Sequence, residues 1–208
     1  MEIESSKRIL ATLYSAADEV GIRDKVFISF GTLLGAIREN GLIEHDTDMD
    51  LCILPISNEK KELFLENCKK RNLFAGWTIE EPNRVAWDDA GEIHWFSVKS
   101  GPAETKCCNW FLLEWNQFMW HSKAFLTRRH FKNGSMGGPY MKGAPAAFFD
   151  GLTQYGFLGV ECNIPWMTGS LLDFWYPNWM VPRYGGASCE DIICNLKTFK
   201  DRSTWTIE

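Results

Sequence analysis

The sequence of 208 residues contains no run of about 20 consecutive apolar residues and therefore predicts no membrane-spanning helix. Its first residues also lack the apolar stretch after a basic segment that marks a signal peptide. We therefore expect a cytoplasmic protein with reduced thiols. No internal repeat or low-complexity segment interrupts the chain, and its length fits a single domain spanning residues 1–208.

An excess of basic charge is also missing. The 27 acidic residues outnumber the 22 Lys and Arg residues, which gives a net charge of −5. Non-specific nucleic-acid binding needs a positive field that displaces counterions, so this composition argues against nucleic acid as a partner. A small phosphorylated substrate needs only a local basic cluster and stays compatible with the charge. The oligomeric state cannot be read from these features.

The seven cysteines include no C-x-x-C pair. The adjacent residues Cys107 and Cys108 would form half of a metal site only if such a pair accompanied them. We therefore favour buried and unreactive thiols for the cysteines of this chain.

Hydrophobic periodicity and turn residues predict alternating helices and strands, followed mainly by strands. The expected helices cover residues 3–20, 33–38, 58–71, 144–150, 168–176 and 188–197. The expected strands cover residues 26–30, 77–80, 84–87, 92–98 and 159–164, with one strand within 44–55 and a further pair within 109–127. This order predicts an α+β fold with a small mixed or antiparallel sheet and flanking helices.

Asp48 and Asp50 lie two residues apart in one of these strands, so their side chains are expected on the same face. Two neighbouring carboxylates repel each other unless a cation lies between them. Mg²⁺ suits this arrangement because it binds through one or two carboxylates and accepts phosphate oxygens. Directly upstream, His45 and Asp46 are candidates for an additional ligand or a base.

Gly31 and Thr32 lie between a predicted strand and a predicted helix. Free backbone N–H groups at a helix N-terminus bind phosphate, and Thr32 is expected to cap the helix. Each motif alone is common, since an Asp-x-Asp is often a solvated turn and a Gly-Thr often a simple cap. Their combination predicts a phosphate site beside a divalent cation.

The segments GTLLGAIR, GLI and HDTDMD resemble the LicD/fukutin family, which belongs to the polymerase β-like nucleotidyltransferase superfamily. These segments and two weaker ones cover residues 31–38, 41–43, 45–50, 157–165 and 171–182. The resemblance is strong over residues 26–55 and moderate over 157–183. It implies that the α+β fold is a nucleotidyltransferase (polymerase β-like) fold.

Members of this family transfer a phosphorylated alcohol from a CDP-linked donor to a glycan. The resemblance therefore implies a phosphotransferase that uses Mg²⁺ or Mn²⁺, with phosphocholine, glycerol phosphate or ribitol phosphate as the transferred group. By family position, Asp48 and Asp50 would bind the metal, and Gly31 and Thr32 would hold the donor phosphates. Arg38 would lie near the site, where its guanidinium stabilises phosphate charge.

The superfamily also uses a third carboxylate on a neighbouring strand, and here the sequence departs from the pattern. His94 stands where that carboxylate is expected. His94 would act as a third catalytic residue, either as a ligand for Mn²⁺ or Zn²⁺ or as the base for the acceptor hydroxyl. Glu92 is a substitute ligand on the same strand, and loss of the third ligand is the remaining alternative.

A local basic patch that includes Lys123 and Arg128 precedes a Gly-rich segment and is a candidate for binding pyrophosphate, although a solvated surface has the same composition. Two other functions stay open. One is nucleotidyl transfer from an NTP to a small hydroxyl-bearing acceptor. The other is a degenerate, non-catalytic nucleotide-binding module, which the substitution at His94 favours.

Overall fold

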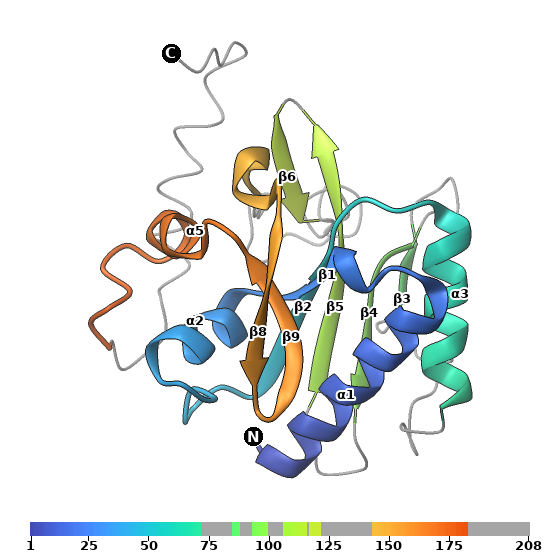
Figure 1. Cartoon of the computed structure of the whole chain (residues 1–208), viewed down its shortest axis with the longest axis horizontal. Helices are drawn as coiled ribbons and strands as arrows, with labels where there is room; N and C mark the ends of the chain where they lie inside the picture. Colours follow the sequence, from blue (N-terminus) through green and yellow to red (C-terminus); the bar gives the residue numbers. More distant parts are fainter. Residues whose placement is uncertain (72–84, 88–92, 100–105, 116, 122–142, 183–208) are drawn as a thin grey trace, which may run out of the picture.

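The computed structural model describes residues 1–71, 85–87, 93–99, 106–115, 117–121 and 143–182 (Figure 1). Its helices are α1 (Ile3–Val20), α2 (Phe30–Arg38), α3 (Asn58–Lys70) and α5 (Thr168–Trp175), with 3₁₀ turns η1 (Arg23–Lys25) and η2 (Ala146–Phe149). Its strands are β1 (Val26–Ile28), β2 (Asp48–Ile53), β3 (Val85–Trp87), β4 (Ile93–Lys99), β5 (Lys106–Trp115), β6 (Phe118–His121), β7 (Gly143–Pro145), β8 (Leu152–Phe157) and β9 (Val160–Pro165). The α+β prediction is confirmed.

The main sheet runs in the order β1-β2-β5-β4-β3, and β6 and β7 extend it from the end of β5. β2 and β5 are parallel, whereas the other neighbours are antiparallel, so of the two predicted alternatives, mixed or antiparallel, the sheet is mixed. β8 and β9 form a separate two-stranded sheet. The parallel pair is the important one for function, because it brings two segments about 60 residues apart in sequence into register.

One face of the main sheet is apolar and is covered by helices. Met49 and Leu51 of β2 are fully buried. Phe96 of β4 packs edge-on against Phe64 of α3, with ring centroids 5.7 Å apart, and α1 lies beside α3 (Figure 1). Burying one such aromatic ring stabilises the fold by roughly 1.5–3 kcal/mol. Because side chains alternate along a strand, Asp48 and Asp50 face away from this core.

The β8–β9 hairpin is held against the edge strand β1 by one buried asparagine. The Asn163 side-chain amide donates hydrogen bonds to the carbonyls of Val26 and Arg23, at 2.8 and 2.7 Å. The Asn163 backbone N–H donates to the hydroxyl of Tyr14 on α1 at 3.0 Å. On β8, the Tyr155 hydroxyl donates to the carbonyl of Ala36 in α2 at 2.9 Å. The hairpin therefore fixes α2 relative to the sheet.

Most predicted elements within the described residues are confirmed, but the region before the second sheet differs. The helix expected over residues 144–150 is a short strand followed by the 3₁₀ turn η2, and β8 was not expected. The β8–β9 turn places Leu158 and Gly159 at φ +51° and +75°. Such turns usually contain Asn-Gly or Asp-Gly, so Leu158 conceals the hairpin in the sequence. The elements expected at 77–80 and 188–197 lie outside the described residues.

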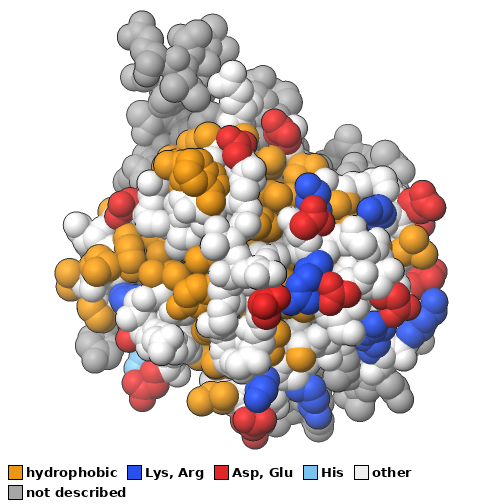
Figure 2. Space-filling model, viewed as in Figure 1, with side chains coloured by type: hydrophobic (Ala, Val, Ile, Leu, Met, Phe, Trp, Pro, Cys, Tyr) orange, Lys and Arg blue, Asp and Glu red, His pale blue; other side chains and the backbone are white. Residues whose placement is uncertain are grey.

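The surface shown in Figure 2 divides into two parts. Acidic and basic side chains are interspersed over α1, whereas apolar side chains gather over α5 and the segment that follows it. Trp166, Met180 and Val181 are the large exposed apolar residues of this region. None of the helices described in the structure combines the length and apolar character needed to cross a membrane.

Candidate active site

Asp48 and Asp50 project from the first half of β2 on the face opposite the core. Both are half-buried, whereas Met49 and Leu51 between and after them are fully buried. This alternation agrees with the strand period of two and gives the shared carboxylate face predicted from the sequence. The two side chains therefore form an acidic pair that water and small ligands can reach.

The N-terminal turn of α2 lies beside this pair. Ser29 precedes the helix in an extended conformation, and the helix begins at Phe30. Phe30 has φ +46°, a left-handed conformation that costs a non-glycine residue of order 1–3 kcal/mol. Its ring packs against Trp175 of α5, with centroids 4.5 Å apart, which holds the turn in place. The expected capping role of Thr32 is wrong, because the helix starts three residues earlier than predicted.

Thr32 instead connects α2 to β2. Its hydroxyl oxygen accepts a hydrogen bond from the backbone N–H of Asp50 at 2.8 Å, and its side chain is buried. Helix α2 therefore fixes the backbone of Asp50. In this structure Thr32 positions the acidic pair, and its proposed contact with donor phosphate stays a prediction.

Gly31 allows a third carboxylate to approach the helix. A β-carbon at Gly31 would lie 2.6 Å from Oδ2 of Asp46, so any side chain there would displace this carboxylate. Burial and the negative charge of Asp48 raise the pKa of Asp46, although the backbone N–H groups of Asp48 and Thr47 oppose the rise. Asp46, Asp48 and Asp50 therefore concentrate negative charge beside α2, as a cation site would require.

β5 supplies the other side of the site, which the sequence did not reveal. Asp48 pairs with Lys106, and Asp50 pairs with Cys108. The Lys106 ammonium lies 3.9 Å from Oδ2 of Asp48, and the Cys108 thiol donates to the same oxygen at 3.7 Å. The indole N–H of Trp110 donates to Oδ1 of Asp50 at 2.9 Å.

Ligand atoms of Asp48, Asp50 and Cys108 all lie within 4.8 Å of one another, so these residues fit around one metal ion. Burial raises the pKa of the Cys108 thiol to about 12; the Asp50 and Asp48 carboxylates add to the rise, whereas Lys106 opposes it. The thiol is therefore protonated at neutral pH when no metal is bound.

Tyr176 is a further residue of the site that sequence reasoning missed. It directly follows α5, and burial raises the pKa of its phenol, with additional contributions from the negative charges of Asp50 and Asp46. The phenol thus lies within electrostatic reach of both carboxylates. Its only signal in the sequence is its place within residues 171–182, far along the chain from the carboxylates.

Arg38 lies at the end of α2 and is largely buried. Its guanidinium forms an ion pair with Glu39 at 2.6 Å and donates to the carbonyl of Trp179 at 3.2 Å. These contacts attach the segment after α5 to α2. The predicted contact of Arg38 with a phosphate is not among them and stays a prediction.

His94 was expected on the strand next to Asp48 and Asp50, and this placement is wrong. β5 lies between β2 and β4, so β4 is about 10 Å from β2. Trp95 pairs with Ala86 and Ile93 with Trp87, which makes His94 the extra residue of a β-bulge. Its side chain lies outside the described residues, so its role as ligand or base stays a prediction. Glu92, Lys123 and Arg128 also lie outside the described residues.

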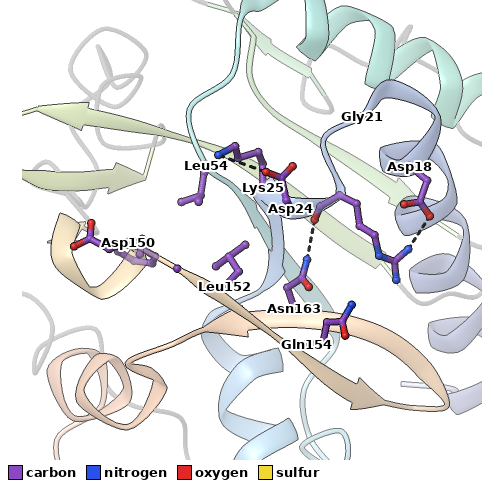
Figure 3. A pocket seen from close by; sticks show the side chains of 12 residues that line it. Asp18, Gly21, Asp24, Lys25, Leu54, Asp150, Leu152, Gln154 and Asn163 are labelled. Carbon is purple, nitrogen blue, oxygen red and sulfur yellow. Dashed lines mark hydrogen bonds and ion pairs between the residues drawn. The ribbon is translucent and has the colours of Figure 1, made fainter.

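A separate cavity of about 790 Å³ lies at the other end of β1 and β2 (Figure 3). Its lining includes Asp18, Arg23, Asp24, Lys25, Leu54, Asp150, Gln154 and Asn163. Arg23 pairs with Asp18 at 2.7 Å and Lys25 with Asp24 at 3.6 Å, so the basic groups are already neutralised. Among the described residues, this cavity therefore has no unpaired basic group with which to select a phosphate.

The comparisons with known proteins agree with the resemblance seen in the sequence. The family model described as LicD/FKTN/FKRP, nucleotidyltransferase domain, matches residues 23–166, which is more than half of the chain. This range contains Gly31, Asp48, Asp50 and Cys108. A search of curated proteins gave no match.

Proposed function

The chain belongs to the LicD/FKTN/FKRP family, and we propose that it is a metal-dependent phosphotransferase with a single nucleotidyltransferase-type domain over residues 1–208. Its substrates would be a CDP-linked alcohol and a glycan hydroxyl. The observation that carries the proposal is the pair Asp48 and Asp50, which share one face of β2 beside the N-terminus of α2.

The residues present fit a divalent cation. Two carboxylates lie within 4.8 Å of each other, together with the sulfur of Cys108, and Asp46 adds negative charge nearby. Carboxylates are the ligands that Mg²⁺ and Mn²⁺ prefer. A cation bound there would neutralise the charge that develops on the transferred phosphate.

The chain itself orients the reactants. Thr32 and Trp110 fix Asp50 through its backbone N–H and its Oδ1. Gly31 allows the Asp46 carboxylate to approach the start of α2 closely. The N-terminus of a helix is suited to a donor phosphate, because its backbone N–H groups and dipole attract anions. Transfer then consists mainly of positioning and charge stabilisation.

The reaction forms one bond and breaks one. The acceptor oxygen bonds to the phosphorus that carries the alcohol, the bond from this phosphorus to the bridging oxygen breaks, and CMP leaves with that oxygen. The acceptor hydroxyl loses its proton to a base. Asp46, beside Gly31, and His94 are the two candidates for this base.

Thermal-shift measurements with the full chain test the donor class. We expect CDP-choline, CDP-glycerol or CDP-ribitol with Mn²⁺ or Mg²⁺ to raise Tm more than ATP or CTP does with the same cation, because ligands that bind the native state stabilise it. A larger rise in Tm with ATP or CTP would contradict this proposal and favour nucleotidyl transfer. No shift with any pair would favour a non-catalytic module.

A further inference from the structure

Asp50 lies in a row of three residues that crosses the sheet from the end of β1 through β2 to β5. On one side it pairs with Cys108 of β5. On the other side, the Ser29 N–H donates to the Asp50 carbonyl at 2.9 Å, which continues the β1–β2 ladder by one residue. Directly paired residues point to the same face of a sheet, so Ser29, Asp50 and Cys108 share the carboxylate face.

The Cys108 thiol lies within this acidic group and is not a distant core thiol. Its sulfur is 3.7 Å from Oδ2 of Asp48, and it joins both carboxylates within a 4.8 Å cluster. The adjacent Cys107 lies on the opposite, apolar face with Met49, its partner in register. The two neighbouring cysteines therefore occupy different environments, and only Cys108 is available as a ligand.

Ser29 gives an independent indication of a ligand. Its side chain is fully buried on the carboxylate face, and its hydroxyl has no hydrogen-bond partner among the residues that the structure describes. Buried hydroxyls are almost always hydrogen-bonded, because leaving one without a partner costs free energy. A metal ion with its bound water between Asp48, Asp50 and Cys108 would offer the missing partner.

We propose that Cys108 is the third metal ligand of the site and replaces the carboxylate found in related nucleotidyltransferases, so that the site prefers a thiophilic divalent cation such as Zn²⁺ over Mg²⁺. This inference rests on the proposed function, because it concerns the same cation. Thiolate ligands favour Zn²⁺ and similar ions, whereas Mg²⁺ favours oxygen ligands. The metal–sulfur bond forms as the thiol proton leaves to solvent.

Co²⁺ is a suitable probe, because a sulfur ligand gives it a charge-transfer absorption band in the near ultraviolet. The metal-free full chain is titrated with Co²⁺, and Zn²⁺ or Mg²⁺ is then added in competition. We expect a band that Zn²⁺ abolishes at stoichiometric concentration and that Mg²⁺ does not. Cys108→Ser should lose the band and bind Zn²⁺ at least about tenfold more weakly. Cys162→Ser, a substitution on β9, should keep both.

Cys108→Asp is a second variant, in which the preference for Zn²⁺ over Mg²⁺ should decrease. It creates a site of three carboxylates, so Mg²⁺ affinity should rise relative to Zn²⁺ affinity. A Co²⁺ band that persists in Cys108→Ser, or a Zn²⁺ to Mg²⁺ preference that neither variant changes, would overturn the inference. If Mn²⁺ binding still depended on Asp48 in that case, the proposed function would stand. If Asp48→Asn altered the binding of no cation, the proposed function would fail as well.

Discussion

The indole N–H of Trp110 on β5 donates a 2.9 Å hydrogen bond to Oδ1 of Asp50 on β2. The two residues are 60 positions apart in the sequence, and the parallel pairing of β2 and β5 brings them together. A carboxylate held by a rigid indole keeps one orientation. Trp110 therefore positions Asp50.

Trp110→Phe should weaken divalent-cation binding by about tenfold, because hydrogen bonds that orient metal ligands typically contribute this much to affinity. The phenyl ring retains most of the packing, so the fold should persist. Isothermal titration with Mn²⁺ measures the affinity, and circular dichroism checks the fold.

Trp175→Phe is the matched control. Trp175 is also buried, but its indole N–H has no hydrogen-bond partner among the described residues, so the same substitution removes no hydrogen bond there. The phenyl ring of Trp175→Phe still packs against Phe30 and holds the start of α2, so the cation affinity of this variant should equal that of the wild type. Equal losses in both variants would show that the effect comes from packing and that Trp110 does not orient Asp50.

Gly31→Ala should weaken binding of the metal–donor pair more than it affects stability. The new β-carbon would lie 2.6 Å from Oδ2 of Asp46 and must displace this carboxylate, while alanine itself favours the helix. We expect a loss of donor affinity, measured by titration, with a change in Tm of only a few degrees.

Gly169→Ala in α5 provides the comparison, because a β-carbon at that position meets no atom within 4 Å. This variant should keep its donor affinity and gain slight stability. If Gly31→Ala bound the donor as tightly as Gly169→Ala, the close approach between Gly31 and Asp46 would have no role in the site.

The local part of the site could be predicted from the sequence, whereas the long-range part could not. The alternation of Asp48 and Asp50 with apolar residues identifies the acidic face, because strand periodicity is a local property. No local signal gives the register of β2 against β5, and a shift of one residue would turn Cys108 to the other face. Cys108 and Trp110 therefore became visible only in the fold.

The start of α2 shows a different limit. The sequence favours Thr32 as the cap, since threonine is common at that position. The helix begins at Phe30 instead, because the packing of its ring against Trp175 stabilises a left-handed backbone that its residue type disfavours. A contact between residues 145 positions apart decides this boundary. The error over His94 has the same origin, since strand order depends on tertiary structure.

Tyr14→Phe should lower the free energy of unfolding by about 1–3 kcal/mol. The Tyr14 hydroxyl accepts the buried backbone N–H of Asn163 at 3.0 Å, and without it this donor has no partner on α1. Urea denaturation measures the change as a lower midpoint at constant slope.

Tyr155→Phe removes a partly buried hydrogen bond to the carbonyl of Ala36. It should lower the free energy of unfolding by about 0.5–1.5 kcal/mol, which is less than the loss expected for Tyr14→Phe. Binding of the CDP-alcohol should be unchanged in Tyr14→Phe, because the Tyr14 hydroxyl contacts β1 and β9 and not the acidic pair. A Tyr14→Phe variant that resists urea as well as the wild type would show that the hydroxyl contributes nothing to holding the hairpin.

The most direct measurement of the central claim is isothermal titration of a CDP-alcohol in the presence of Mn²⁺, using the wild type, Asp48→Asn, Asp50→Asn and Asp150→Asn. Asp150 is an exposed carboxylate beside the separate cavity and serves as the control. We predict saturable, Mn²⁺-dependent binding in the wild type and in Asp150→Asn, and its loss in both site variants while they remain folded. Unchanged affinity in folded Asp48→Asn and Asp50→Asn would contradict the assignment of the acidic pair as the active site.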